Sequence, residues 1–189
     1  MSEEQLIAVT VGKINPLNRT IDLEPYNPEW PSQYAKLEAQ IRDALGAKVL
    51  MTEHVGSTSV PGLSAKPIID VVLAVLNSAD ESSYVLPLES MGYVLKIREP
   101  DWFEHRMLKA PAIDGNVHVF SQGCEEIDRM LTFRNWLRNH EDDRKLYERA
   151  KRELAAHTWK YVQNYADAKS EVVREILERA LGARSTFFA

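Results

Sequence analysis

The chain has 189 residues, carries a net charge of -5 at pH 7, and is 44% hydrophobic and 27% charged. This length and composition are typical of a globular domain with one sizeable core. The acidic balance argues against general nucleic-acid binding, which needs a basic surface, so we expect no nucleic-acid partner. Cys124 is the single cysteine, which excludes an intrachain disulfide and a thiolate metal cluster.

The sequence predicts a cytoplasmic protein that does not bind a membrane. Its acidic start, MSEEQ, lacks the basic region of a signal peptide. No apolar run approaches the roughly 20 residues of a membrane-spanning helix. A lone cysteine fits a reducing compartment. The sequence does not indicate an oligomeric state.

The first half of the chain alternates strand and helix signals. Residues 1–25 are predicted to form an N-terminal arm or edge strand, with β-like pieces at 6–11 and 20–23. A helix is predicted from Asn27, which can cap it, to Gly46, because apolar residues recur every three or four positions between them. Two further strands are predicted at 48–55 and 67–76. The second is so continuously apolar that we expect it to be buried on both faces.

The second half is predicted to begin with a helix, continue with three strands and end in three more helices. A helix over 78–92 precedes the strands, which are predicted at 93–99, 102–110 and 116–120. The remaining helices are predicted at 125–139, 142–157 and 159–181. The fold class is therefore α+β, with a mixed β-sheet flanked by helices at 26–122 and a C-terminal helical layer at 123–189 packed on that core.

The loop between the first two core strands is dense in glycine and hydroxyl side chains. Gly56, Ser57, Thr58 and Ser59 supply backbone N–H and hydroxyl donors, which is the chemistry of a phosphate cradle. The loop is not a P-loop, because the GxxxxGK[ST] spacing is absent. Lys66 follows closely enough to neutralise a phosphate. A tight turn and a solvated lysine are the alternative interpretation.

Asp70 is a lone carboxylate in an aliphatic strand. Buried without a partner it would cost several kcal/mol, on the order of 2–7 for a polar group and more for a charge. It must therefore sit at a strand end, pair with a cation, or bind a metal. A structural ion pair or a capping role remains the alternative.

Other polar residues are weaker candidates. His118 shares a strand face with Asn116, and a packed histidine is as good an interpretation as a ligand. Arg106 lies in the predicted hairpin, where it can face an anionic substrate. Arg134 shares a helix face with Arg138, which suits phosphate recognition but also a solvated surface.

Of the three remaining features, two have both a functional and a structural interpretation. His54 can hydrogen-bond the glycine-hydroxyl loop or serve only in packing. Tyr165 and Lys169 are four residues apart and carry the same ambiguity as the arginine pair. The charged stretch 141–153 is interpreted as a solvated helix face.

The run HVGSTSVPGLSAKPIID, from His54 to Asp70, resembles the signature of the GrpB family. The segments YNPEW at 26–30, NVHV at 116–119 and LTFRNWLR at 131–138 resemble further parts of that family, so that the resemblance covers roughly residues 20–180. The family has a nucleotidyltransferase-like fold and also occurs fused to some dephospho-CoA kinases.

The resemblance implies a nucleotide site. In the nucleotidyltransferase fold a Gly-Ser turn holds the triphosphate, and an Asp-x-Asp pair with a third carboxylate binds two magnesium ions. Here Gly56 and Ser57 match the turn and Asp70 matches the first carboxylate, while His118 corresponds to the third. Mg²⁺ and a nucleoside triphosphate, with ATP favoured, are the implied cofactors, and Asp70 and His118 are the implied catalytic and metal-binding residues.

Val72 stands where the second carboxylate is expected. One aspartate and one histidine are a poor set for paired Mg²⁺, which prefers oxygen ligands. Either one metal suffices, or the protein binds nucleotide without transferring it, or another carboxylate completes the site, namely Glu53, Asp101 or Glu104.

Three functions follow from these alternatives. The leading expectation is transfer of a nucleotidyl group from a nucleoside triphosphate to a small-molecule acceptor. The alternative is a non-catalytic nucleotide- or anion-binding module that supports a partner enzyme. The third is an enzyme of other chemistry that uses Asp70 and His118 as an acid–base pair.

Overall fold

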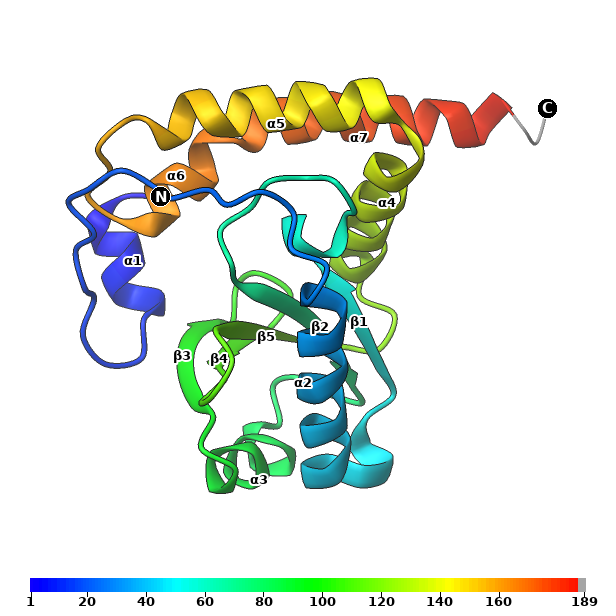
Figure 1. Ribbon diagram of the computed structural model, residues 1–189. Coiled ribbons are helices and arrows are strands. Elements are labelled where there is room, and N and C mark those ends of the chain that lie inside the picture. Colours follow the sequence, from blue (N-terminus) through cyan, green and yellow to red (C-terminus); the bar gives the residue numbers. More distant parts are fainter. Residues whose placement is uncertain (187–189) are drawn as a thin grey trace.

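Five strands form one mixed sheet in the order β1-β2-β5-β4-β3 (Figure 1). The strands are β1 Met51–Val55, β2 Ile69–Val75, β3 Val94–Glu99, β4 His105–Lys109 and β5 Gly115–Ser121. Strands β2 and β5 run parallel, and the other neighbouring pairs are antiparallel.

The structure is a computed structural model that describes residues 1–186, and the side chains of 1–183. The last three residues of the predicted helical region 123–189 lie outside the described residues.

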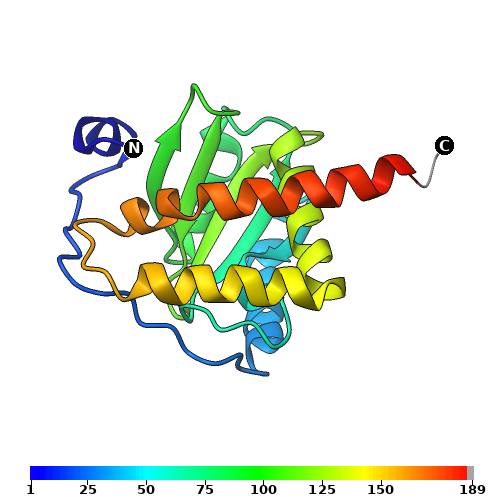
Figure 2. The same cartoon turned by 90° about the horizontal axis from the view of Figure 1, so that it is seen from above.

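Helices cover both faces of this sheet, which confirms the α+β class. The helices of the core are α2 Trp30–Leu45, α3 Val85–Ser90 and α4 Glu125–Asn139. The C-terminal helices are α5 Glu141–Ala155, α6 Val162–Ala168 and α7 Ser170–Thr186, and α5 and α7 lie side by side above the sheet (Figures 1 and 2). Within residues 1–186, no helix has both the length and the apolarity needed to cross a membrane.

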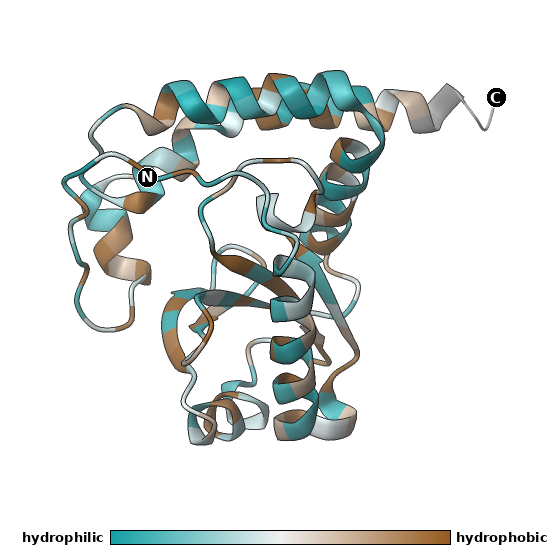
Figure 3. Cartoon of the chain, viewed as in Figure 1, coloured by the Kyte–Doolittle hydropathy of each residue, from teal (hydrophilic) through white to brown (hydrophobic). Residues whose placement is uncertain are grey.

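Strand β2 is buried on both faces, as its apolar run predicts. Val71 and Leu73 belong to the core between the sheet and helices α2 and α3. Val72 faces the other way and packs with Phe120 and with Ile127 of α4. In Figure 3 most of β2 has the brown colour of hydrophobic residues, while α5 is mostly teal, the colour of hydrophilic ones.

The predicted N-terminal strand at 6–11 is wrong, because Glu3–Val9 forms helix α1. Ser2 caps the helix by accepting a hydrogen bond from the backbone N–H of Gln5 at 3.2 Å, and the Gln5 side chain accepts from the Ser2 N–H at 2.7 Å. This reciprocal capping box satisfies two backbone donors that a strand edge would leave open. The only β pairing of the predicted strand is a single bridge between Thr10 and Ile97.

The predicted last helix, 159–181, is two helices, α6 and α7, which meet at Lys169. The break lets the two halves pack on different partners. Tyr165 of α6 packs with Ile21 and Ala155. Ile176 of α7 joins a separate cluster with residues of α4 and α5. The predicted helix at 78–92 is also shorter than expected, with a 3-10 turn at Glu81–Ser83 before α3.

His54 ties the sheet to the loop that follows β1. Its ring stacks on Tyr34 of α2 with 5.0 Å between centroids, and Nε2 lies 3.0 Å from the Thr58 hydroxyl. The side chain is buried, with 6% of the residue exposed. Burial lowers the pKa of His54 from its usual value near 6.5 to about 4, against the attraction of Asp70.

This depressed pKa predicts acid sensitivity. The unfolded chain binds a proton to His54 near pH 6.5, whereas the folded chain does so only near pH 4, so stability is present above pH 6.5 and is lost as pH falls between these values. The loss by pH 4.5 is about 2–3 kcal/mol. Urea unfolding at pH 7 and 4.5 measures it, and the variant His54→Gln should lose most of this slope. An unchanged slope in the variant would contradict the assignment.

Candidate functional site

The parallel pairing of β2 with β5 builds the centre of the site. The register places Asp70 opposite Asn116, and the Asn116 amide donates to Asp70 Oδ1 at 2.9 Å. His118 lies two residues further along the same strand face, with Nε2 3.6 Å from the same carboxylate oxygen. The structure therefore brings together the two residues that the sequence singles out for catalysis.

Asp70 is held in its charged form. Its side chain is 30% exposed. Burial raises the pKa of Asp70, but the hydrogen bonds from His118 and Asn116 and the charge of Lys66 outweigh that effect and lower the pKa below its usual value. A carboxylate at this position is thus a fixed negative charge.

The glycine-hydroxyl loop lies directly against this carboxylate. Gly56 has φ +69° and ψ -173°, a conformation open essentially only to glycine. A Cβ atom here would lie 2.4 Å from Asp70 Oδ2. The hydroxyls of Thr58 and Ser59 are used inside the loop, since Thr58 donates to the Ile68 carbonyl at 3.1 Å and Ser59 to the Gly56 carbonyl at 2.6 Å. Of the predicted cradle hydroxyls, only that of Ser57 faces the C-terminal helices.

Three lysines from separate parts of the chain surround this point. Lys151 Nζ donates to Ser57 Oγ at 3.1 Å and to the Ser64 carbonyl. Lys66 and Lys169 both lie over the ring of Tyr165, at 5.7 and 4.5 Å from its centroid. Asp70 attracts both of these lysines, but forms an ion pair with neither.

The lysines are crowded together with little negative charge. Burial lowers the pKa of Lys66 and of Lys169 to about 8, and that of Lys151 to about 7. Repulsion from Lys169 adds to the effect at the other two. Within the described residues, the buried hydroxyl of Tyr165 is the one buried side-chain polar atom without a hydrogen-bond partner. The cluster therefore has an excess of positive charge and an unfilled donor, which suits an anionic ligand.

A groove of about 480 Å³ leads to this cluster from the surface between α4, α5 and α7. Its lining residues include Arg129, Tyr147, Lys169, Val173, Arg174 and Leu177. Tyr147 and Lys169 belong both to the groove and to the lysine cluster, so the two are continuous. The groove combines an apolar wall with Lys169, while Arg129 and Arg174 among its lining residues are paired with Glu126 and Glu178.

A second chain of polar groups reaches His118 from strands β4 and β3 on the same face of the sheet. Glu99 Oε2 lies 2.7 Å from His105 Nδ1, and His105 Nε2 lies 3.1 Å from His118 Nδ1. The two imidazole rings are stacked with 5.2 Å between centroids. Burial lowers the pKa of His105, although the hydrogen bond to Glu99 opposes it. These contacts fix the orientation of the His118 ring.

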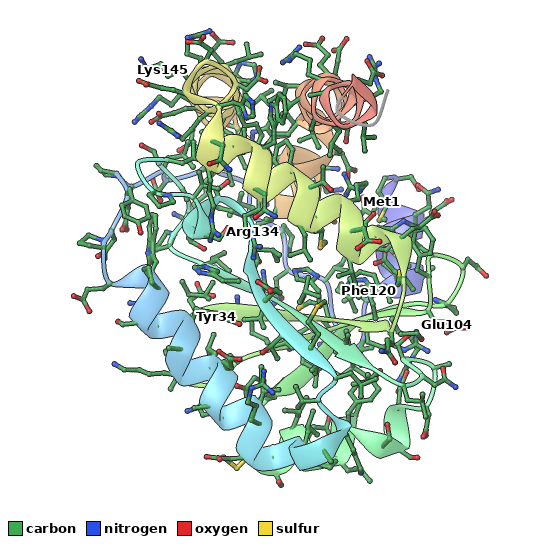
Figure 4. The ribbon with its side chains drawn as sticks, turned by 90° about the vertical axis from the view of Figure 1, so that its right-hand side faces the viewer. Met1, Tyr34, Glu104, Phe120, Arg134 and Lys145 are labelled. Atoms are coloured by element: carbon green, nitrogen blue, oxygen red, sulfur yellow. The ribbon has the colours of Figure 1, made fainter. Side chains whose placement is uncertain are left out.

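Two sequence-predicted arginines lie outside the cluster. Arg106 is buried in an ion pair with Glu81 at 2.6 Å, and its strand partner is Val119, which places it on the sheet face opposite His118. Arg134 is buried against β1, where it donates to Glu53 at 2.7 Å and to the His54 carbonyl at 2.8 Å (Figure 4). Both arginines serve internal contacts because an unpaired buried guanidinium would be costly.

The expectation of a solvated helix face at 141–153 is wrong for one side of α5. Tyr147 and Lys151 are buried there, with 5% and 2% of each residue exposed. Their four-residue spacing, continued by buried Ala155, is the signal that marks this inner stripe. The outer side is solvated as expected, and Figure 4 shows Lys145 projecting away from the protein.

The side chains around Asp70 do not fit a magnesium site. Within the described residues, no group of three or more His, Cys, Asp or Glu side chains is placed to hold a metal ion. The side-chain oxygen of Asn116 already accepts from Lys109 at 3.1 Å. Glu53 and Glu104 pair with arginines instead of completing the site. Mg²⁺ requires several oxygen ligands, and neighbouring ammonium groups disfavour it further.

The fold and the site together define an α+β protein with a group of lysines beside the loop that leads into β2 and next to its C-terminal helices. The chain belongs to the GrpB family, since the family model described as GrpB protein matches residues 20–179. It is similar to a UPF0157 protein of Halalkalibacterium halodurans, with 58% identity over 95% of this chain and 92% of the relative. A UPF0157 protein of Streptomyces coelicolor is 44% identical over 87% of this chain and 86% of the relative.

Two further comparisons extend this assignment. The crystal structure of the conserved protein GrpB from Enterococcus faecalis superimposes with a TM-score of 0.72 at 28% identity, covering 86% of this chain and 99% of that one. A dephospho-CoA kinase of Mycolicibacterium paratuberculosis is 28% identical over 85% of this chain, which corresponds to 46% of the kinase. The chain thus resembles one part of that longer protein.

The contact between Gly56 and Asp70 makes a testable prediction. Gly56→Ala should destabilise the protein through backbone strain of about 1–3 kcal/mol and a steric clash of similar size. Gly62→Ala is the matched control, since Gly62 has φ +78° in the same loop but open space where its Cβ would lie. Urea unfolding should show the larger loss at Gly56. Equal losses would mean that the loop does not press on Asp70.

Proposed function

We propose that this protein binds a nucleoside triphosphate in the groove between α4, α5 and α7, with its phosphates on the lysine cluster. The proposal depends on Lys66 and Lys169, which are attracted by Asp70, and on Lys151, which donates to Ser57 in the adjoining loop. Ammonium groups are donors that bind phosphate oxygens well. ATP is the favoured nucleotide on the family resemblance.

The electrostatics of the cluster support a polyanionic ligand. Bringing mutually repelling lysines out of water costs free energy, which appears as their lowered pKa values. A bound triphosphate would supply the missing negative charge and raise those values. Affinity should therefore weaken as pH rises through about 8, where Lys66 and Lys169 lose their protons.

The groove supports a ligand larger than a phosphate ion. Val173 and Leu177 provide an apolar wall beside Lys169. A nucleobase or another flat apolar group fits such a wall while the phosphates reach the lysines. Arg129 and Arg174 at the same groove are paired with Glu126 and Glu178, so the positive charge offered to the ligand comes from Lys169.

In this proposal the protein is a nucleotide-binding module that supports a partner enzyme. The resemblance to one part of a dephospho-CoA kinase chain favours that arrangement. The apolar Val72 and the poor ligand set around Asp70 agree with a site that binds without needing paired Mg²⁺.

Isothermal titration with ATP, CTP, GTP and UTP tests the proposal. We expect binding in the presence of EDTA, because lysines supply the positive charge. Lys169→Met should weaken binding by about tenfold or more, as the loss of a charge-assisted hydrogen bond is worth roughly 1.5–3 kcal/mol. Lys145→Met, on the exposed side of α5, is the control that keeps full affinity. No binding of any nucleotide, or binding only with Mg²⁺, would overturn the proposal.

A second candidate is the transfer of a nucleotidyl group to a small-molecule acceptor, and the orientation of His118 favours it. With Glu99 ionised, His105 carries its proton on Nδ1 and accepts from His118 Nδ1–H through Nε2. His118 Nε2 lies 3.6 Å from Asp70 Oδ1 and becomes a base when it releases its proton. Such a base can take the proton of an acceptor hydroxyl as that oxygen attacks the α-phosphate.

Pyrophosphate release measures this second activity. The protein would be incubated with ATP and pools of small alcohols and amines, and release should depend on one acceptor. His118→Gln should slow release by about 10²–10⁴-fold while leaving ATP affinity within twofold, since the base acts after binding. Binding of ATP without release from any pool would leave the module as the function.

A further inference from the structure

The hydroxyl of Ser57 contacts two side chains, Lys151 and Tyr147, in a way that phosphate binding does not require. Lys151 Nζ lies 3.1 Å from Ser57 Oγ. The hydroxyl of Tyr147 also interacts with Ser57, which partly offsets the burial that raises the pKa of Tyr147 to about 12. Lys151 lies over the Tyr147 ring at 5.0 Å from the centroid. Ser57 itself is only half-buried, and Tyr147 lines the groove that opens to the surface.

Lys151 is placed as a base. Its residue is 2% exposed, and it forms none of the ion pairs found in residues 1–183. Its other hydrogen bond goes to the Ser64 carbonyl, which orients the amine without neutralising a charge. A buried amine without a carboxylate partner favours its neutral form, and a neutral amine accepts a proton from a hydroxyl.

We propose that Ser57 and Lys151 form a nucleophile–base pair that cleaves esters carrying an anionic group. The pairing of a serine hydroxyl with a lysine base within hydrogen-bond distance is an established variant of nucleophilic catalysis. The activity goes beyond nucleotide binding, because a phosphate cradle needs Ser57 as a donor and does not need its proton removed.

The chemistry balances with groups already in place. Lys151 Nζ takes the Ser57 proton as Oγ attacks the ester carbonyl carbon, and the bond from that carbon to the leaving oxygen breaks. The leaving alcohol takes the proton from the Lys151 ammonium. Water then attacks the acyl-serine and gives a proton to Lys151, and Ser57 regains its hydrogen when the acid departs.

The anionic group follows from the neighbouring charges. Lys169 lines the groove, and Lys169 and Lys66 both lie over the ring of Tyr165. A carboxylate or phosphate on the acyl part of the ester would bind these ammonium groups, while its carbonyl carbon reaches Ser57. A neutral ester lacks that attachment and should react more slowly.

The test compares 4-nitrophenyl hemisuccinate, an anionic ester, with 4-nitrophenyl acetate on the full-length protein. We expect nitrophenol release, faster for the anionic ester, and a covalent fluorophosphonate adduct mapped by mass spectrometry to Ser57. Ser57→Ala should abolish the adduct, and Lys151→Met should slow its formation by about 10²–10⁴-fold. The rate for wild type should rise with pH through about 7, as Lys151 deprotonates.

Two surface variants, Ser90→Ala and Lys145→Met, serve as controls for the two substitutions and should react like wild type. If the wild-type protein forms no adduct, or forms it equally in Ser57→Ala, the proposal is wrong. An adduct at Ser57 that forms at the same rate in Lys151→Met would also overturn it, since Lys151 would then be only structural.

If Lys151→Met does not fold, experiments on the wild-type protein still test the Ser57–Lys151 pair. The wild-type pH profile and the location of the adduct then decide, because a serine without a base shows no rise in rate near pH 7. Nucleotide titration by the same wild-type protein reports separately on the lysine cluster, so either proposal can fail while the other stands.

Discussion

The charge of Asp70, fixed in place by the parallel pairing of β2 and β5, is the feature on which the cleft depends. The register sets Asn116 beside it and His118 above it on one sheet face. Gly56 must lack a side chain because the loop backbone presses on this carboxylate. The charge of Asp70 attracts Lys66 and Lys169, but neither lysine forms an ion pair with it. One negative charge therefore organises an otherwise positive site.

The residues around Asp70 differ from those that the two-metal site of a nucleotidyltransferase requires. A metal site needs several anionic oxygen ligands, and here a buried Val72 and an engaged Asn116 stand where such ligands would be required. The ammonium groups of Lys151 on α5, of Lys169 between α6 and α7, and of Lys66 before β2 supply positive charge. In the proposed function these ammonium groups bind the phosphates directly, so binding does not require a divalent cation.

Much of the fold follows from local sequence signals, whereas the site depends on contacts that those signals do not contain. The apolar run at 67–76 and the four-residue periodicity at 30–45 predict β2 and α2, because burial and period are properties of the segment itself. At 3–9 a capping box outweighs β propensity, so the helix there was missed. Arg106 and Arg134 were expected in the cleft, but each finds an acidic partner far away in the chain. Lys151 is hidden in a charged stretch, and only its spacing from Tyr147 marks the buried side of the helix.

The central claim is that lysines, and not metal ions, hold the phosphates of the ligand. A crystal structure grown with ATP and Mn²⁺, with anomalous data collected at the manganese edge, tests it most directly. The account predicts phosphate oxygens within hydrogen-bond distance of the ammonium groups of Lys66, Lys151 and Lys169, with no anomalous peak beside Asp70. Manganese bound between Asp70, His118 and the phosphates would contradict it.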